Sequence, residues 1–344
     1  IGIHTMNDMN LKDKTILVTG GTGSFGNYIV NRLIPFEPKE IRIFSRDEKK
    51  QFDMKNFYKS YDFVKYNIGD IRDFNRLNSI MQGVDIVYQA AALKHVTACE
   101  EAPFEAVQTN IIGIENLIRS AIENNIEKVI GVSTDKAVKP VNVMGMSKAI
   151  QERLLINANR LYKTSDTKFC VVRYGNVLLS RGSVIPLFRD VLRKNQKIKI
   201  TDEGMTRFLL TLDDAIDLVF YATDKTHGGE VFVKKAPSTK ITTIAEILSE
   251  ESGVQFEYDV IGKFPGEKLH EILITEEELD RTQDNDHFFS INPYWGEGGL
   301  NDQTVEYSSD EEIVEDKEVI KSLIAKADLR SKEVETDSGT YSKL

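Results

Sequence analysis

Short apolar runs alternate with amphipathic segments through the first half of the chain. The runs are rich in β-branched residues and lack a strict alternation with polar positions, which is typical of strands buried on both faces. They occupy residues 14–19, 40–44, 63–66, 85–88, 128–132 and 169–173. Helical periodicity separates them, through Tyr28, Ile29, Val30 and Leu33 and over residues 47–58, 73–81, 104–123 and 144–162. Strands that alternate with helices in this way predict an α/β fold with a doubly wound parallel sheet.

The alternation loosens after residue 176. We expect helices over 184–193, 213–223 and 243–251, and strands over 207–212 and 230–233. The chain is therefore divided into a larger domain at 14–176, to whose sheet the C-terminal half can return strands, and a smaller α+β lobe at 177–307. Residues 308–344 are acidic and then amphipathic, and we expect an oligomer contact there. Residues 1–13 are interpreted as a tag remnant and leader, because five residues precede Met6.

Composition narrows the class of protein. The chain has 44 basic and 54 acidic residues, a net charge of −10, which disfavours binding to a nucleic-acid backbone. Cys99 and Cys170 provide neither a disulfide framework nor a zinc site, and we expect no metal. No apolar run approaches the roughly 18 residues that a membrane span needs. The sequence thus predicts a cytoplasmic protein without a membrane span.

A glycine-rich loop, TGGTGSFG at 19–26, follows the first predicted strand and opens the first helix. Gly20 allows a sharp turn, Gly23 allows a pyrophosphate to approach the backbone, and Gly26 allows the helix to pack closely on the sheet. The N-terminus of that helix offers unpaired N–H groups to phosphates. The loop predicts a Rossmann-like dinucleotide site, whose expected contacts here are Gly20, Thr22, Gly23, Ser24, Phe25 and Gly26.

The end of the second predicted strand bears on the choice of cofactor. Ser45 and Arg46 come first, where an NAD site usually has an acidic residue, and Lys49 follows shortly after. Positive side chains suit a ribose 2′-phosphate, so NADP is favoured, while Asp47 keeps NAD as the alternative. Further expected cofactor contacts are Asp70, which could accept from the adenine amino group, and Ile71, Ala90 and Lys94.

Polar side chains also follow the fourth and fifth predicted strands, at the edge where open α/β sheets bind ligands. Lys94 and His95 follow the fourth, and His95 is either catalytic or a structural hydrogen-bonding group. Asp135 and Lys136 follow the fifth and pair a carboxylate with an amine. Burial beside a cofactor would bring the pKa of Lys136 toward neutrality, as a general base requires.

The glycine spacing resembles that of the short-chain dehydrogenase/reductase superfamily. In that superfamily a Tyr precedes the reactive Lys by four positions, which places both on one face of a helix. Here Lys148 has Met144 at that position, and a thioether cannot accept a proton. The resemblance assigns Lys148 to the nicotinamide ribose and requires another group to act as base.

More narrowly, the chain resembles the inverting UDP-N-acetylglucosamine 4,6-dehydratases of capsular polysaccharide synthesis, in which Met replaces the Tyr. The matching motifs are FSRDE (44–48), AALKHV (91–96), STDKAVKPVNVMGMSK (133–148), VRYGNVLLSRGSVIP (172–186) and PGEKLHE (265–271). The resemblance implies bound NADP and a homo-oligomer, expected to be a hexamer. It makes Lys136 the base at sugar C5, Asp135 the acid for the C6 hydroxyl and Thr134 a partner of O4.

Because Met144 cannot accept the proton from O4, this proton must pass to Lys136, to Lys148 or to an ordered water. The same resemblance assigns the substrate to Lys94, His95, Asn176, Arg181, Arg207 and Glu271. Two alternatives stay open. A nucleotide-sugar 4-epimerase would use the same loop but no C5 base, and a non-catalytic NADP-binding protein would explain the loss of the Tyr.

Overall fold

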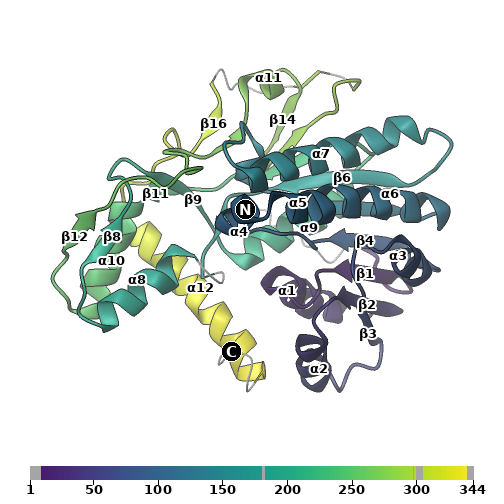
Figure 1. Ribbon diagram of the computed structural model, residues 1–344, viewed down its shortest axis with the longest axis horizontal. Helices are drawn as coiled ribbons and strands as arrows, with labels where there is room; N and C mark the ends of the chain where they lie inside the picture. Colours follow the sequence, from purple (N-terminus) through teal and green to yellow (C-terminus); the bar gives the residue numbers. More distant parts are fainter. Residues whose placement is uncertain (1–8, 180–182, 297, 300–304, 339–344) are drawn as a thin grey trace.

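A computed structural model describes residues 9–179, 183–296, 298–299 and 305–338 of the chain (Figure 1). Its main sheet has nine strands in the order β14-β15-β10-β6-β5-β4-β1-β2-β3. The six predicted strands are present within two residues of their expected ends: β1 (Thr15–Thr19), β2 (Glu40–Ser45), β3 (Val64–Ile68), β4 (Ile86–Gln89), β5 (Lys128–Val132) and β6 (Lys168–Arg173). These six are parallel, which confirms the predicted doubly wound sheet. The strand order reverses between β1 and β4, where such sheets open a ligand crevice.

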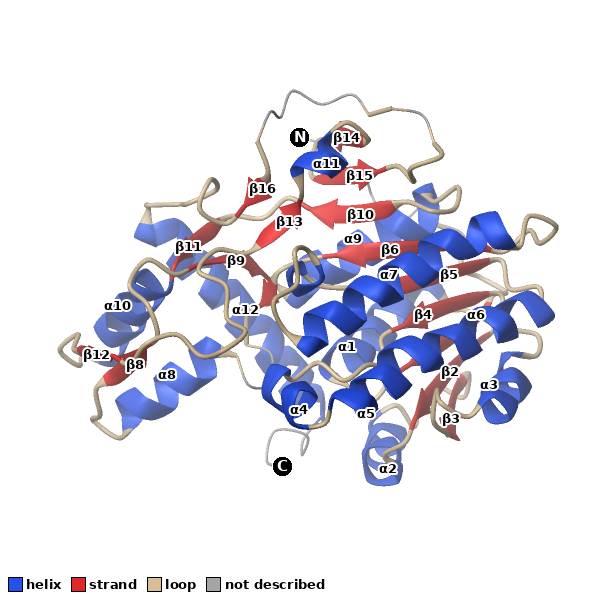
Figure 2. Ribbon diagram, turned by 45° about the horizontal axis from the view of Figure 1, so that its top comes forward, coloured by secondary structure: helices blue, strands red, loops and turns tan. Residues whose placement is uncertain are grey.

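Helices cover both faces of the sheet (Figure 2). One face carries α3 (Phe74–Met81), α6 (Gly113–Glu123) and α7 (Val143–Leu161), and the other carries α1 (Ser24–Leu33) and α9 (Leu212–Lys225). The amphipathic pattern of α6 explains its placement, because Ile114, Leu117 and Ile118 are buried against the sheet layer.

The helix expected over 104–123 is divided into three parts. They are α5 (Pro103–Val107), a π-helical turn (Gln108–Ile112) and α6. The side chain of Asn110 in the turn accepts from the backbone N–H of Leu93 at 2.9 Å and donates to its carbonyl at 3.0 Å. The Asn110 side chain thus forms hydrogen bonds with the backbone of the segment after β4, as a neighbouring strand would. A widened turn at this position is typical of helices beside functional sites.

The second half of the chain contributes to both parts of the molecule. The strands β10 (Val231–Lys234), β14 (Thr282–Asn285) and β15 (Phe288–Ile291) extend the main sheet, with β10 parallel to β6 and the other two antiparallel. The rest builds α8 (Val184–Arg193), α10 (Ile241–Ser252) and short strands that form one three-stranded and two two-stranded sheets beside the main sheet (Figure 1). These strands are β7 (Asn176–Val177), β8 (Ile198–Ile200), β9 (Thr206–Leu210), β11 (Ser238–Lys240), β12 (Tyr258–Val260), β13 (Ile272–Ile274) and β16 (Tyr307–Ser308).

The C-terminal helix α12 (Lys317–Ser338) belongs to the lobe. Its apolar residues Ile320, Ile324 and Ala327 are buried in the core shared with α8 and α10, and Arg189 of α8 donates two hydrogen bonds of 2.6 Å to Asp328. These apolar residues thus pack within their own chain, and the expected contact of the segment with a neighbouring subunit stays a prediction. In the described part of the chain, no helix combines the length and apolar character needed to cross a bilayer.

Candidate active site

A cleft of about 610 Å³ opens at the carboxyl ends of β1, β2 and β4. Thirteen of the predicted cofactor residues line it: Gly20, Thr22, Gly23, Ser24, Phe25, Gly26, Ser45, Arg46, Asp47, Asp70, Ile71, Ala90 and Lys94. His95 lines it as well, directly before α4 (Val96–Glu101). The crevice expected at the reversal of strand order is therefore present.

The glycine loop approaches its neighbours too closely for side chains. A Cβ on Gly26 would lie 2.4 Å from the Cα of Gly21, and one on Gly20 would lie 2.8 Å from the carbonyl carbon of Ala90. Gly20 also has a φ of +65°, which other residues rarely adopt. The N-terminus of α1 has Gly23 as its cap and no side chain bonded to its first N–H groups. The loop and the helix end therefore fit a dinucleotide diphosphate.

The end of β2 presents cations to the cleft. Asp47 is occupied as the N-cap of α2 (Glu48–Phe57), where it accepts from the backbone N–H of Lys50 at 2.9 Å, and this hydrogen bond lowers the pKa of its carboxyl. Arg46 is exposed and lies 3.6 Å from Asp70. Lys50 lines the cleft, whereas the predicted Lys49 pairs with Asp53 on the surface of α2. The structure thus places Lys50 at the cleft, and the predicted contact of Lys49 with the cofactor stays a prediction.

Asp70 is tied to the end of β3. Arg72 donates to its carboxylate at 2.7 and 3.0 Å. Burial alone would raise the pKa of Asp70, but the hydrogen bonds from Arg72 lower it further than burial raises it. Asp70 therefore faces the cleft as a carboxylate, able to accept a hydrogen bond.

A second polar cluster forms where β5 ends, at the same edge of the sheet. Asp135 is fully buried, and its Oδ1 accepts from the Thr134 hydroxyl and from Lys136 Nζ, both at 2.9 Å. Lys136 Nζ also lies 3.3 Å from Glu271 Oε1 and donates to Asn176 Oδ1 at 3.4 Å. Five predicted site residues from three distant segments are thus brought together around one ammonium group.

Burial and the neighbouring carboxylates together set the charge state of this cluster. Burial lowers the pKa of Lys136, but the carboxylates of Asp135 and Glu271 outweigh it, so the pKa lies above its usual value. The lowered pKa that we expect beside a bound cofactor stays a prediction for that state. Burial and the charge of Asp135 raise the pKa of Glu271.

Met144 and Lys148 lie on α7, as predicted. Met144 packs in an apolar cluster with Cys99 and Ala106. Lys148 Nζ donates to the carbonyl of Val132 at 2.6 Å and to the side chain of Gln151 at 2.8 Å, and burial lowers its pKa to about 8. Lys148 is not among the residues that line the cleft, so its predicted contact with the ribose stays a prediction.

The remaining predicted substrate residues have other surroundings. Arg207 of β9 donates to the backbone carbonyls of Thr206, Lys268 and Leu269, and its Nε lies 3.8 Å from Glu271 Oε1. Its guanidinium therefore holds the 268–271 segment in place rather than projecting into open space. Arg181 lies outside the described residues.

Thr109 is one of the cleft residues that were not predicted from the sequence. The hydroxyl of Thr109, in the π-helical turn, is buried and has no hydrogen-bond partner, and the residue lines the cleft. Its position within an apparently continuous amphipathic helix gave no signal, because the turn depends on the contact between Asn110 and a distant segment.

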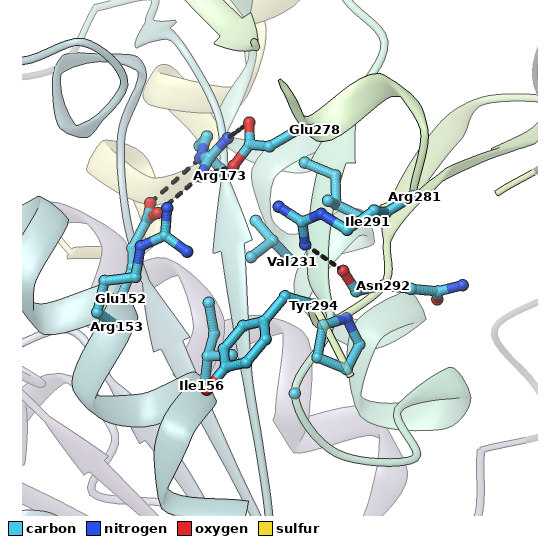
Figure 3. Close-up of a pocket in the computed structure, with 12 residues that line it drawn as sticks. Glu152, Arg153, Ile156, Arg173, Val231, Glu278, Arg281, Ile291, Asn292 and Tyr294 are labelled. Atoms are coloured by element: carbon cyan, nitrogen blue, oxygen red, sulfur yellow. Dashed lines mark hydrogen bonds and ion pairs between the residues drawn. The ribbon is translucent and has the colours of Figure 1, made fainter. Parts of the chain in front are cut away.

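A buried ion triad connects the two halves of the site (Figure 3). Arg173 of β6 lies 2.7 Å from Glu152 of α7 and 2.9 Å from Glu278 of α11 (Glu276–Leu279), and it donates to the carbonyl of Leu273 in β13 at 2.7 Å. Lys148 is one helical turn from Glu152, and Glu271 directly precedes β13. One guanidinium thus fixes the elements that carry both residues.

Most of the chain is similar in sequence to known proteins. The family model described as "Polysaccharide biosynthesis protein" matches residues 16–293. An uncharacterized membrane protein of Methanocaldococcus jannaschii is 44% identical over 320 residues, which are 91% of this chain and 96% of that protein. A UDP-glucose 4-epimerase of Rickettsia bellii is 47% identical over 283 residues, covering 81% of this chain and 83% of the epimerase.

Solved structures show the same fold. Pen from Bacillus thuringiensis superposes with a TM-score of 0.88 at 38% identity, over 93% of this chain and 99% of Pen. A dTDP-glucose 4,6-dehydratase from Streptomyces venezuelae shares the fold with a TM-score of 0.66 at 21% identity, over 74% of this chain and 86% of that one. The fold is thus the one found in short-chain dehydrogenase/reductases that modify nucleotide sugars. The chain belongs to the polysaccharide biosynthesis protein family.

Proposed function

We propose that the protein dehydrates UDP-N-acetylglucosamine across C4 to C6 with inversion at C5, using bound NADP. The product is a UDP-linked 2-acetamido-2,6-dideoxy-4-hexulose for capsule or other surface polysaccharides, made in the cytoplasm. The observation that carries the proposal is the cluster of Thr134, Asp135 and Lys136 at the ligand-binding edge of the sheet. A dehydration at C5 and C6 needs a base and an acid side by side, and an amine 2.9 Å from a carboxylate provides both.

The residues of the cluster have separate roles in this proposal. A bound nicotinamide supplies the chemistry of taking hydride from C4 and returning it to C6. Thr134 holds O4, Lys136 removes the proton from C5, and Asp135 delivers a proton to the departing C6 oxygen. Met144 contributes no proton chemistry, so the proton from O4 goes to Lys136, to Lys148 or to water.

The end of β2 supports NADP over NAD. The carboxylate of Asp47 caps α2 and pairs with Lys50, so it is not free for a ribose hydroxyl. Arg46, with 55% of its side chain exposed, and Lys50 are the cations at this end of the cleft, and both suit a 2′-phosphate.

The lobe is proposed to hold the UDP group, with Asn176, Arg181 and Arg207 as candidate contacts and with Lys94 and His95 on the side of the cleft. A homo-oligomer, of which a hexamer is one form, is supported by exposed apolar side chains on α5 to α7. These are Phe104, Ile112, Met146 and Ile150. An apolar surface of this kind on neighbouring helices is typical of subunit contacts.

The direct test is incubation of the protein and NADP with UDP-N-acetylglucosamine in deuterated water, followed by mass spectrometry and NMR. We expect a product that has lost one water, carries deuterium at C5 and has the inverted C5 configuration. Lys136→Ala should abolish turnover, whereas Lys194→Ala, in an exposed pair with Asp190, should not change it. A product that has the mass of the substrate and an altered configuration at C4 would refute the proposal.

The second candidate is a nucleotide-sugar 4-epimerase, which the 47% identity to the Rickettsia bellii protein favours. In the same experiment an epimerase gives a product of unchanged mass without deuterium at C5. A third candidate, a non-catalytic NADP-binding protein, is favoured by Met144. It would bind NADP and convert no nucleotide sugar.

A further inference from the structure

Lys136 is in the wrong protonation state for its proposed task. Its Nζ lies between two carboxylates, 2.9 Å from Asp135 Oδ1 and 3.3 Å from Glu271 Oε1, and these hold it as an ammonium ion. An ammonium nitrogen has no lone pair and cannot remove a proton from carbon. A neighbouring group must first accept one of its protons.

The two carboxylates differ in the hydrogen bonds that they accept from side chains. Asp135 Oδ1 accepts hydrogen bonds from Thr134 and from Lys136, and Asp135 Oδ2 is buried without a hydrogen-bond partner. Glu271 is 2% exposed, and its Oε2 is buried without a hydrogen-bond partner. Its other cationic neighbours are farther away, with Lys268 Nζ 3.7 Å from Oε2 and Arg207 Nε 3.8 Å from Oε1.

Those two neighbours are also engaged elsewhere. Lys268 donates to the backbone carbonyls of Val138 and Asp135, and Arg207 donates to the carbonyls of residues 206, 268 and 269. The charged groups that face Glu271 are thus Asp135 and Lys136 from the turn after β5, Arg207 from β9 and Lys268 from its own segment. Lys136 is the nearest of these cations.

We propose that Glu271 is the proton acceptor that converts Lys136 into a neutral amine during the reaction. This inference rests on the proposed function, because it assigns a role within the same site. The resemblance assigns Glu271 to substrate binding. The inference assigns the same carboxylate to proton transfer.

The proton movements balance. Lys136 passes one ammonium proton to Glu271, which leaves a neutral amine and a carboxylic acid. The amine removes the C5 proton, the electron pair of the C5–H bond forms the C5–C6 double bond, and the C6–O bond breaks. That proton passes from Lys136 to Asp135 and leaves with the C6 oxygen as water. Glu271 then returns its proton to Lys136, and all three groups are as they began.

The surroundings of Glu271 favour this transfer. Burial and the negative charge of Asp135 raise the pKa of its carboxyl, which makes it easier to protonate than an exposed glutamate. A bound sugar that displaces the remaining water would strengthen both effects. The acceptor therefore needs no separate ordered water or additional residue.

The test is Glu271→Gln, which keeps the shape of the side chain and removes the acceptor. We expect kcat at neutral pH to fall about 100-fold, while KM changes little. The kcat of the variant should then rise by about tenfold per pH unit, because hydroxide must deprotonate Lys136 instead. Glu257→Gln, in an exposed pair with Lys197, is the matched control and should keep the wild-type profile. A raised KM with a wild-type pH profile would show that Glu271 binds substrate, and the inference would be wrong.

A second measurement separates this inference from the proposed function. NMR of protein labelled with ¹³C at the glutamate carboxyl groups and loaded with NADP reports the titration of Glu271 without turnover. We expect one resonance, missing in Glu271→Gln, to titrate above the exposed glutamates. If it titrates with them, the inference fails even when the wild type dehydrates the sugar. If the wild type yields no dehydrated product, the proposed function fails whatever the titration shows.

Discussion

Replacing Arg173 by Met tests how strongly the buried triad holds the site together. The substitution keeps an unbranched side chain of similar length but removes the charge between Glu152 and Glu278. The three side chains are 4%, 6% and 9% exposed, so water cannot compensate for the loss. The carbonyl of Leu273 also loses its donor.

The expected cost follows from leaving two carboxylates buried without a partner. Breaking a buried ion pair by removing one member costs about 3–5 kcal/mol. The two carboxyls limit the cost by taking up protons, since an unpaired buried carboxylate has a raised pKa. We therefore expect Arg173→Met to lower the free energy of unfolding by about 3–5 kcal/mol at neutral pH.

The loss should shrink on acidification. Burial would raise the pKa of Glu278, but Arg173 lowers it below its usual value of 4.5. A carboxyl whose pKa is lowered in the folded state stabilises the protein above its unfolded pKa and loses that contribution as pH falls through the folded value. Below about pH 4 the wild type therefore loses the stabilisation by Glu278 that Arg173→Met lacks at every pH. The difference in the free energy of unfolding between wild type and variant then narrows.

Urea unfolding at pH 7 and at pH 4, followed by tryptophan fluorescence and circular dichroism at one protein concentration, measures both effects. Lys194→Met, which breaks the exposed pair with Asp190, is the control and should cost less than about 1 kcal/mol. An Arg173→Met variant as stable as this control would refute the reasoning. So would a loss of stability that does not depend on pH.

Three further predictions concern the cleft and α7. Gly26→Val should abolish cofactor binding measured by fluorescence, because a Cβ there would lie 2.4 Å from the Cα of Gly21; binding at wild-type affinity would contradict the geometry. Arg46→Ala should weaken NADP binding by about tenfold or more in calorimetry and leave NAD affinity nearly unchanged, since it removes about 1.4 kcal/mol or more of contact with the 2′-phosphate alone. Burial lowers the pKa of Lys148 from 10.5 to about 8, so the folded protein binds fewer protons than the unfolded chain between these pH values. The free energy of unfolding of the wild type should therefore rise with pH over this range by up to about 3 kcal/mol relative to that of Lys148→Met. Parallel stability curves for wild type and Lys148→Met across this range would rule that out.

The parallel strands could be predicted from the sequence because each is a continuous apolar run that contributes to the core by itself. The short strands of the lobe could not, since β13 and β16 have three and two residues and exist only by pairing with each other across the chain. The same reason hides the widened turn at Asn110, whose cause is a contact with Leu93. Length and local periodicity are informative where an element buries its own face, and uninformative where a distant partner defines it.

In the candidate site, too, features that are local in sequence could be predicted, and features that depend on distant residues could not. The glycine loop and the pair Asp135–Lys136 are local in sequence, and the structure places them at the ligand-binding edge as expected. The charge state of Lys136 depends on Glu271, which is 135 positions away, and no local pattern reveals that contact. A lowered pKa for Lys136 follows from desolvation alone. The carboxylate of Glu271, which acts in the opposite direction, cannot be foreseen from the sequence.

The position of Met144 is informative about where proton chemistry can occur in this fold. Met144 lies in an apolar cluster, and Lys148 on the same helix directs its ammonium to the carbonyl of Val132 and to Gln151. Met144 supplies no proton acceptor on this face of α7, which leaves Lys148 as a titratable group there. A further group of titratable side chains lies at this edge of the sheet, in the turn after β5 and in the segment before β13. Arg173 holds the β13 segment in place. The apolar surroundings of Met144 therefore leave the C5 proton transfer of the proposed reaction to Lys136 and its carboxylate neighbours.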